Sequence, residues 1–263
     1  MSQVRKKNKL FDFRMLGILL CASMAFFYSD VKGQTALDSF TKKQEHKVAL
    51  YLTFDDGPCE GSDQVNLISL IDSIKINVFI IGSRVFLNDT LKQYYLSYKH
   101  NPFVEIGNHS FTHANGKYRR YYEDPSLVMN DFLMNEDSLN LKNKISRLPG
   151  RNTWRLKKRG RDDYAGGAAA ADSLATKNYF VFGWDIEWLY DEELDERDAA
   201  SAMEKKIEEM VWEKKSFTSW NIIILCHDYL LTNKHNRLSL QLFIQKIKEK
   251  ENYSFEHLSN YPK

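Results

Sequence analysis

Apolar runs alternate with stretches of helical spacing along the chain from residue 47 onward. Six of these runs are rich in β-branched and aromatic residues and are apolar on both faces, which is typical of buried strands in a parallel sheet. The predicted strands are residues 48–54, 76–82, 103–108, 145–149, 179–184 and 221–227. The predicted helices lie between and after them, at residues 63–74, 88–99, 125–143, 162–177, 195–214 and 237–250. Six or seven such units in roughly 215 residues favour an α/β fold whose sheet forms a barrel, complete or incomplete.

Residues 1–33 form a segment of their own. A basic stretch precedes an apolar core at 15–28 and a small residue, Gly33, which is typical of a secretory signal peptide cleaved after that glycine. An uncleaved membrane anchor is the alternative, although the apolar core is shorter than the ~20 residues that span a bilayer. We expect export to the periplasm or the cell exterior, with membrane contact through this segment alone. A short linker, 34–45, then leads into one domain at 46–263.

Charge and cysteine content narrow the choice of partners. The chain carries a formal charge of +2, but residues 1–33 hold six basic and two acidic residues, which leaves the rest near −2. The basic excess therefore belongs to the export signal and gives no support to nucleic-acid binding, and no feature predicts a protein partner. Outside that segment only Cys59 and Cys226 remain. Strand alternation turns Cys226 away from His227, and a core of this size needs no disulfide, so we expect both to be free thiols or at most a weak bridge.

Candidate reactive residues follow the ends of the predicted strands, where chemistry gathers in α/β folds. Asp55 and Asp56 end the first strand, and consecutive strand side chains point to opposite faces, so these carboxylates should have different roles. His109 and His113 follow the third strand, and an i, i+4 pair on a helical turn brings both rings within reach of one metal ion. One carboxylate and two imidazoles leave positions open, as catalytic zinc requires. A surface turn and structural histidines are the alternatives for each pair alone.

Two further candidates lie at other strand ends. Arg147 ends the strand at 145–149 and can hold a carboxylate through charge-assisted hydrogen bonds. His227 ends the strand at 221–227 and would share the barrel mouth with the other clusters. Taken alone, each has a structural alternative, a Pro-Gly turn after Arg147 and a structural role for His227.

The segments TFDDGP, HSFTH, RLPG and LCH occur in an order that resembles the NodB-type polysaccharide deacetylases of carbohydrate esterase family four. The resemblance covers about residues 45–250. It implies a distorted (β/α) barrel with a metal-dependent amide or ester hydrolase site. It also implies that Asp56, His109 and His113 bind one divalent metal ion, which we expect to be Zn²⁺, with Co²⁺ or Ni²⁺ as alternatives.

The same resemblance implies roles for four more residues. Asp55 is the general base, and Arg147 orients it. His227 is the general acid, and Leu225 lines the acetyl pocket.

The fourth motif of the family, usually Asp-x-x-Asp-Trp, fits this chain only loosely at 183–191. Asp185 and Glu187 have the same strand parity, so either could face the barrel mouth. We expect Asp185 to be the partner of His227 and Trp188 to form a wall of the substrate groove. A capping acid and a buried tryptophan are the alternatives.

The substrates of the family are acetylated glycans such as chitin oligomers, peptidoglycan, glucosamine polymers and acetylxylan. We expect N-deacetylation over O-deacetylation, because a departing amine needs a proton from an acid such as His227. An acetylxylan-type esterase and a small-molecule amidohydrolase are alternatives, since the motifs report chemistry and not substrate. A secreted glycan-binding protein without turnover is the alternative from another class.

Two loops, 114–125 and 151–161, carry aromatic residues that could stack on sugars, with solvated surface as the alternative for each loop. These residues are Tyr118, Tyr121, Tyr122 and Trp154.

Overall fold

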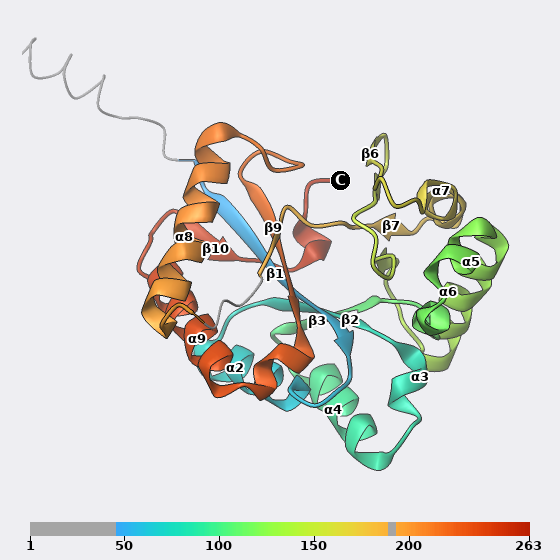
Figure 1. Cartoon of the computed structure of the whole chain (residues 1–263), viewed down its shortest axis with the longest axis horizontal. Coiled ribbons are helices and arrows are strands. Elements are labelled where there is room, and N and C mark those ends of the chain that lie inside the picture. The colour runs from blue at the N-terminus through green and yellow to red at the C-terminus, as the bar shows by residue number, and fades with distance from the viewer. Residues whose placement is uncertain (1–45, 189–192) are drawn as a thin grey trace, which may run out of the picture. The chain divides into compact units, whose positions relative to one another are not determined.

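The computed structural model describes residues 46–188 and 193–263, which form one sheet with helices around it (Figure 1). The strands are β1 (Val48–Gly57), β2 (Ile76–Ile80), β3 (Val104–Asn108), β4 (Ile145–Ser146), β5 (Trp154–Leu156), β6 (Arg159–Arg161), β7 (Phe180–Val181), β8 (Ile186–Glu187), β9 (Asn221–His227) and β10 (Tyr253–Phe255). The helices are α2 (Ser62–Asp72), α3 (Gly82–Val85), α4 (Asp89–His100), α5 (Tyr118–Glu123), α6 (Pro125–Leu139), α7 (Ala168–Thr176), α8 (Glu196–Glu213) and α9 (Lys234–Lys248). Short 3₁₀ turns are η1 (His113–Gly116), η2 (Asp228–Thr232) and η3 (Leu258–Asn260). The expected leader and linker lie outside the described residues.

The sheet curls into half a barrel. Its strand order is β6-β5-β7-β4-β3-β2-β1-β9-β8, and β10 pairs with β1. The pairings around β1, β2, β3, β4, β7, β8, β9 and β10 are parallel, whereas β5 runs antiparallel to β6 and β7. Within the described part of the chain, β6 and β8 end the order without pairing to each other. The distorted, incomplete barrel expected from the sequence is therefore confirmed.

Alternation along β1 and β9 separates two faces of the sheet. Residues of one parity form the larger core under α2, α4, α8 and α9: Leu50, Leu52, Phe54, Ile222, Ile224 and Cys226. Residues of the other parity, such as Tyr51 and Ile223, fill the concave face together with Phe79 and Trp154. Asp55 and His227 continue this second parity and lie opposite each other in register. The concave face is therefore apolar near the strand amino ends and polar at the carboxyl ends.

The six predicted strands are all present, but two of them are short, with only Ile145–Ser146 and Phe180–Val181 paired. The helix predicted from residue 162 begins only at Ala168. Gly166 and Gly167 before it have φ of 96° and 101°, a left-handed backbone that glycine adopts readily and that does not continue a helix. The β5–β6 hairpin and β10 were not predicted.

Cys59 and Cys226 are both described, and no disulfide joins them. Cys226 packs in the helix-side core, which confirms that strand alternation turns it away from His227. Among the described helices, none combines the length and apolarity that crossing a membrane requires.

Trp188 does not form a groove wall, so that prediction is wrong. Its N–H donates to the Leu225 carbonyl at 2.8 Å, which extends the pairing of β8 with β9. The side chain follows the parity of Ile186, is 2% exposed, and meets the Phe243 ring of α9 edge-on at 5.0 Å between centroids. Trp188 therefore belongs to the core beneath the helices.

We expect Trp188→Ala to lower the free energy of unfolding by about 3–5 kcal/mol, because it leaves a large cavity under α9. Urea unfolding measures this change. The control is Trp212→Ala on α8, where the side chain is 78% exposed and the expected change is within about 0.5 kcal/mol. An unchanged urea midpoint for Trp188→Ala together with weaker glycan binding would restore the groove-wall role.

Candidate active site and metal centre

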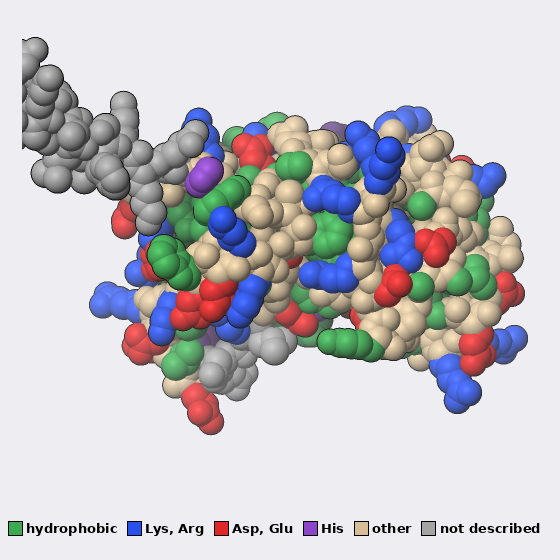
Figure 2. Space-filling model, turned by 90° about the horizontal axis from the view of Figure 1, so that it is seen from above, with side chains coloured by type: hydrophobic (Ala, Val, Ile, Leu, Met, Phe, Trp, Pro, Cys, Tyr) green, Lys and Arg blue, Asp and Glu red, His purple; other side chains and the backbone are tan. Residues whose placement is uncertain are grey.

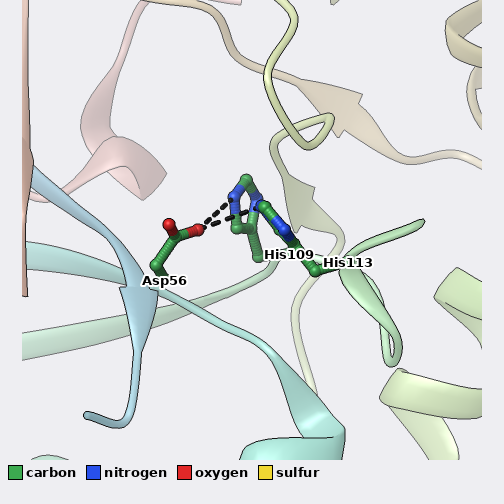
Figure 3. A group of neighbouring side chains, drawn as sticks. All are labelled: Asp56, His109 and His113. Atoms are coloured by element: carbon green, nitrogen blue, oxygen red, sulfur yellow. Dashed lines mark ion pairs between the residues drawn. The ribbon is translucent and has the colours of Figure 1, made fainter. Parts of the chain in front are cut away.

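Asp56, His109 and His113 converge on one point at the mouth of the half-barrel (Figure 3). The Asp56 Oδ1 atom lies 3.4 Å from His109 Nε2 and 3.0 Å from His113 Nε2. One ligand atom from each residue falls within 4.8 Å of the other two. A carboxylate oxygen and two imidazole nitrogens suit zinc and related divalent ions, so the residues expected as ligands are placed where they could hold one.

The outer nitrogens of both imidazoles have partners that orient the rings. His109 Nδ1 lies 2.9 Å from the Arg147 carbonyl, and His113 Nδ1 lies 3.2 Å from the Tyr118 hydroxyl. A carbonyl oxygen can only accept, so His109 carries a proton on Nδ1, and its Nε2 atom faces Asp56. Such outer partners are typical of metal-binding histidines.

The electrostatics of the cluster favour positive charge between the carboxylates. Burial disfavours the charged form of His109, but Asp55 and Asp56 outweigh burial and raise the pKa of this imidazole. Burial likewise opposes ionisation of Asp56, yet hydrogen bonds to His109 and His113 lower its pKa well below the usual range. A cation placed there would meet an ionised carboxylate.

The two histidines do not share a helical turn, which corrects the local structure inferred from their spacing. His109 directly follows β3, and its N–H donates to the Ile80 carbonyl at 3.1 Å. Ser110 and His113 have φ of 65° and 53°, so the loop between the imidazoles is not helical. Buried Asp131 fixes this loop by accepting from the Thr112 N–H at 3.1 Å and the Thr112 hydroxyl at 3.0 Å.

A bulge separates the two adjacent carboxylates. The register of β1 against β2 shifts between Phe54 and Gly57, and Asp56 has φ of 70°. Arg84 holds this left-handed residue by donating from Nη1 to the Asp56 carbonyl at 2.5 Å. The bulge, more than plain alternation, thus turns the Asp56 side chain toward the imidazoles while Asp55 keeps the concave parity.

Arg147 fixes Asp55. Its Nη1 atom donates to Asp55 Oδ1 at 2.8 Å, and the arginine is completely buried. The remaining guanidinium contacts go to Thr53 Oγ1 and to the carbonyls of Phe182 and Gly183, at 2.8 to 3.2 Å. Asp55 Oδ2 stays on the side of the metal centre, 3.7 Å from His109 Nε2. The structure therefore brings Arg147 and Asp55 together and leaves one carboxylate oxygen facing the centre.

His227 and Leu225 lie on the same concave face as Asp55. They are opposite Asp55 and Thr53 respectively in the β1–β9 register. Leu225 is 3% exposed, whereas His227 is half-buried, and its ring centroid lies 5.6 Å from that of Tyr229. Both residues are thus placed at the mouth, as expected from their position on the last strand.

Asp185 is not the partner of His227, and this prediction is wrong. Its carboxylate accepts from the Phe217 N–H at 2.7 Å and the Ile223 N–H at 2.9 Å. Ile223 precedes His227 by four residues, which is about 13 Å along a strand. Asp185 therefore caps backbone groups beside β9, and no hydrogen bond or ion pair joins Glu187 to His227 among the described residues.

Asp228 is a buried acid that the sequence did not single out. It is completely buried, and its Oδ2 atom accepts from the Ser62 hydroxyl and, at 2.7 Å, from the Tyr98 hydroxyl. Burial raises its pKa to about 7. A Cβ atom at Gly57 would lie 2.8 Å from Asp228 Oδ2, so the glycine of the first motif makes room for this carboxyl. Asp228 thereby ties the turn after β1 to α4 and to the end of β9.

The raised pKa of Asp228 predicts how it affects stability with pH. Between its ordinary value of 3.8 and about 7, the folded state holds a proton that the unfolded chain releases, so this contribution to stability falls as pH rises. We expect Asp228→Asn, relative to the wild type, to gain about 1 kcal/mol or more in unfolding free energy between about pH 5 and about pH 7.5. Urea unfolding in EDTA measures it, with exposed Asp63→Asn as the control. A pH-independent difference would contradict the assignment.

The loop aromatics divide into two groups. Tyr121 is 8% exposed and bonded to Asp131, and Trp154 is fully buried and stacked on Phe217 with centroids 4.2 Å apart, so neither can stack on a sugar. Tyr118 and Tyr122 are half-buried, and the Tyr118 hydroxyl lies beside His113. The sugar-stacking hypothesis is therefore wrong for Tyr121 and Trp154.

The fold is an α/β half-barrel, and three residues at its strand ends could hold a metal ion. A separate carboxylate beside them is bound by an arginine. The model of the polysaccharide deacetylase family matches residues 42–145, which include both aspartates and both histidines of this centre. No curated protein matches the chain in sequence.

Three solved structures show the same fold. A polysaccharide deacetylase from Bacillus cereus is 21% identical with a TM-score of 0.58, covering 82% of this chain and 95% of its own. A carbohydrate esterase family four esterase from Streptococcus mutans is 17% identical with a TM-score of 0.61, covering 83% and 89%. The catalytic domain of a peptidoglycan N-acetylglucosamine deacetylase from Eubacterium rectale is 15% identical with a TM-score of 0.59, covering 82% and 91%. The chain is therefore similar to polysaccharide deacetylases over residues 42–145 and shares its fold with these three structures.

Proposed function

We propose that this protein is a metal-dependent hydrolase that removes acetyl groups, N-acetyl in preference to O-acetyl, from a polysaccharide or oligosaccharide. The observation that carries the proposal is the division of labour between two adjacent carboxylates. Asp56 lies against both imidazoles, whereas Asp55 is bound by Arg147 and keeps one oxygen toward the same centre. Hydrolysis at a metal centre needs one acid to hold the ion and another to accept a proton. The proposal of a glycan substrate rests on the similarity to the polysaccharide deacetylase family.

Asp56, His109 and His113 would hold one divalent ion, with zinc favoured by the mixed oxygen and nitrogen donors. The two imidazoles are already oriented by the Arg147 carbonyl and Tyr118. When bound, such an ion supplies Lewis-acid polarisation of the acetyl carbonyl and of water.

The remaining steps fall to residues of the concave face. Asp55 Oδ2 would accept the proton of the attacking water, and Arg147 holds that carboxylate in place. His227, across the mouth, would give a proton to the departing nitrogen. Leu225 would line the pocket for the acetyl methyl group. Export directed by residues 1–33 is part of the same proposal, because such an enzyme would meet its polymer outside the inner membrane.

The two aspartates provide the first test. We expect Asp55→Asn to keep the metal and the fold while losing nearly all acetate release, at least about a hundredfold. Asp56→Asn should weaken metal affinity first, with partial recovery of activity at high metal concentration. Metal content and acetate release from a panel of acetylated glycans are measured for both variants, with exposed Asp63→Asn as the control. Loss of metal from Asp55→Asn, or full affinity in Asp56→Asn, would reverse the assignment.

His227 provides the second test. We expect His227→Ala to retain metal and to lower turnover of an N-acetyl glycan about a hundredfold or more, since an amine leaves poorly without a proton. An activated acetyl ester, whose leaving group needs no proton, should lose much less. His100→Ala, at the exposed end of α4, is the control and should change neither rate. Equal losses on both substrates would give His227 a different role.

A further inference from the structure

Arg151 lies one aromatic ring away from the metal centre. Its guanidinium carbon is 4.6 Å from the Tyr122 ring centroid and 5.7 Å from that of Tyr118. The Tyr118 hydroxyl in turn lies 3.2 Å from His113 Nδ1. The Tyr122 hydroxyl donates to the Pro149 carbonyl at 2.6 Å, which fixes the second ring. Two anchored rings thus hold the Arg151 side chain at the edge of the site.

The hydrogen-bonding capacity of Arg151 is mostly unused. Its Nη1 atom donates to the Gly150 carbonyl at 2.8 Å, and its buried Nε atom has no partner. Among the described residues, none forms an ion pair with Arg151, and Nη1 is the only atom of its guanidinium group with a hydrogen bond. Buried arginine N–H groups ordinarily donate to an acceptor, so a bound anion could supply the acceptor that Nε lacks.

Other charged residues near Arg151 are already occupied. Asp163, the acid of the adjoining loop, uses both oxygens on backbone N–H groups of Asn152 and Ala165, at 2.6 and 2.8 Å. Arg155 on β5 is paired with Asp162 and Asp172. Arg151 therefore differs from Arg155 in having no acidic partner among the described residues.

Arg84 is a second cation near the Tyr118 edge of the site. Arg151 and Arg84 both counteract the effect of Asp56 on Tyr118, whose pKa is nevertheless raised, first by burial. Figure 2 shows Lys and Arg side chains, with Asp and Glu side chains among them, over the part of the chain labelled β6 in Figure 1. An anionic group approaching the Tyr118 edge of the site would meet Arg151 and Arg84 as well as the acid Asp56.

We propose that Arg151 binds a carboxylate of the glycan, so that the substrate is an acidic glycan. The acetylated amino sugar at the metal centre would then neighbour a sugar that bears a carboxylate, such as a uronic or muramic acid residue. A planar guanidinium held by two rings matches a carboxylate through paired N–H donors and loses little freedom on binding. This inference rests on the proposed function and makes Arg151 a specificity-determining residue.

The test compares one acetylated oligosaccharide that contains carboxylates with its carboxyl-reduced form, which differs only in that group. We expect the metal-loaded wild type to prefer the acidic form about tenfold or more in kcat/KM, mainly through KM. Arg151→Gln should lose this preference and keep its kcat/KM on the reduced form within about twofold. Arg151→Lys should recover part of the preference, because it restores the charge without the planar donors.

The matched control is Arg119→Gln on α5, whose side chain is 95% exposed and paired with Glu123. It should keep the full preference. Equal kcat/KM of the wild type for both forms, or an equal loss on both forms in Arg151→Gln, would overturn the inference. If neither form releases acetate, the proposed function fails and binding decides the role of Arg151. Calorimetric titration should then show a preference for the acidic form that Arg151→Gln abolishes, and no preference would overturn the inference.

Discussion

The buried ion pair between Arg147 and Asp55 is the contact on which the rest of the site depends. The arginine side chain connects the end of β1 to the carbonyls that follow β7, while its own backbone carbonyl accepts from His109 Nδ1. One residue therefore orients both the proposed base and one proposed metal ligand. Removing a single partner from such a buried pair typically costs about 3–5 kcal/mol, because the other charge is left without compensation.

The curled sheet positions the Arg147–Asp55 ion pair. Along β1 and β9, the side chains on the concave face change from apolar Tyr51 and Ile223 to polar Asp55 and His227. The core and the candidate site therefore lie one after the other on the same face of the sheet. The bulge at Asp56 then turns this side chain away from both faces of the sheet and toward the two imidazoles at the mouth. Asp228, packed against Gly57, ties this bulged turn to the strand end that carries His227. The proposed base, metal ligand and acid are thus all placed by one strand pair.

The sequence predicted the parts of this arrangement that depend on short-range pattern. Apolar runs located the strands, and the strand-end positions of Asp56, His109 and His113 brought them to one mouth. The predicted roles of Asp185 and Trp188 were wrong. Both residues flank β8, a two-residue strand at the end of the sheet order, and strand parity alone does not show which face of the sheet such a short strand turns toward the site. The sequence also missed Asp228, whose partners Ser62 and Tyr98 lie 166 and 130 residues away along the chain. The sequence also could not predict which aromatic loop residues are buried, because Trp154 is buried against Phe217 from a distant segment.

A crystal structure of the zinc-loaded protein would test the roles of the two carboxylates directly. We expect an ion within about 2.0–2.2 Å of one Asp56 oxygen, His109 Nε2 and His113 Nε2. Asp55 should remain outside the coordination sphere, with its Oδ1 atom still hydrogen-bonded to Arg147. An ion bound by Asp55 with the Arg147 contact broken would contradict the division of roles between the two carboxylates.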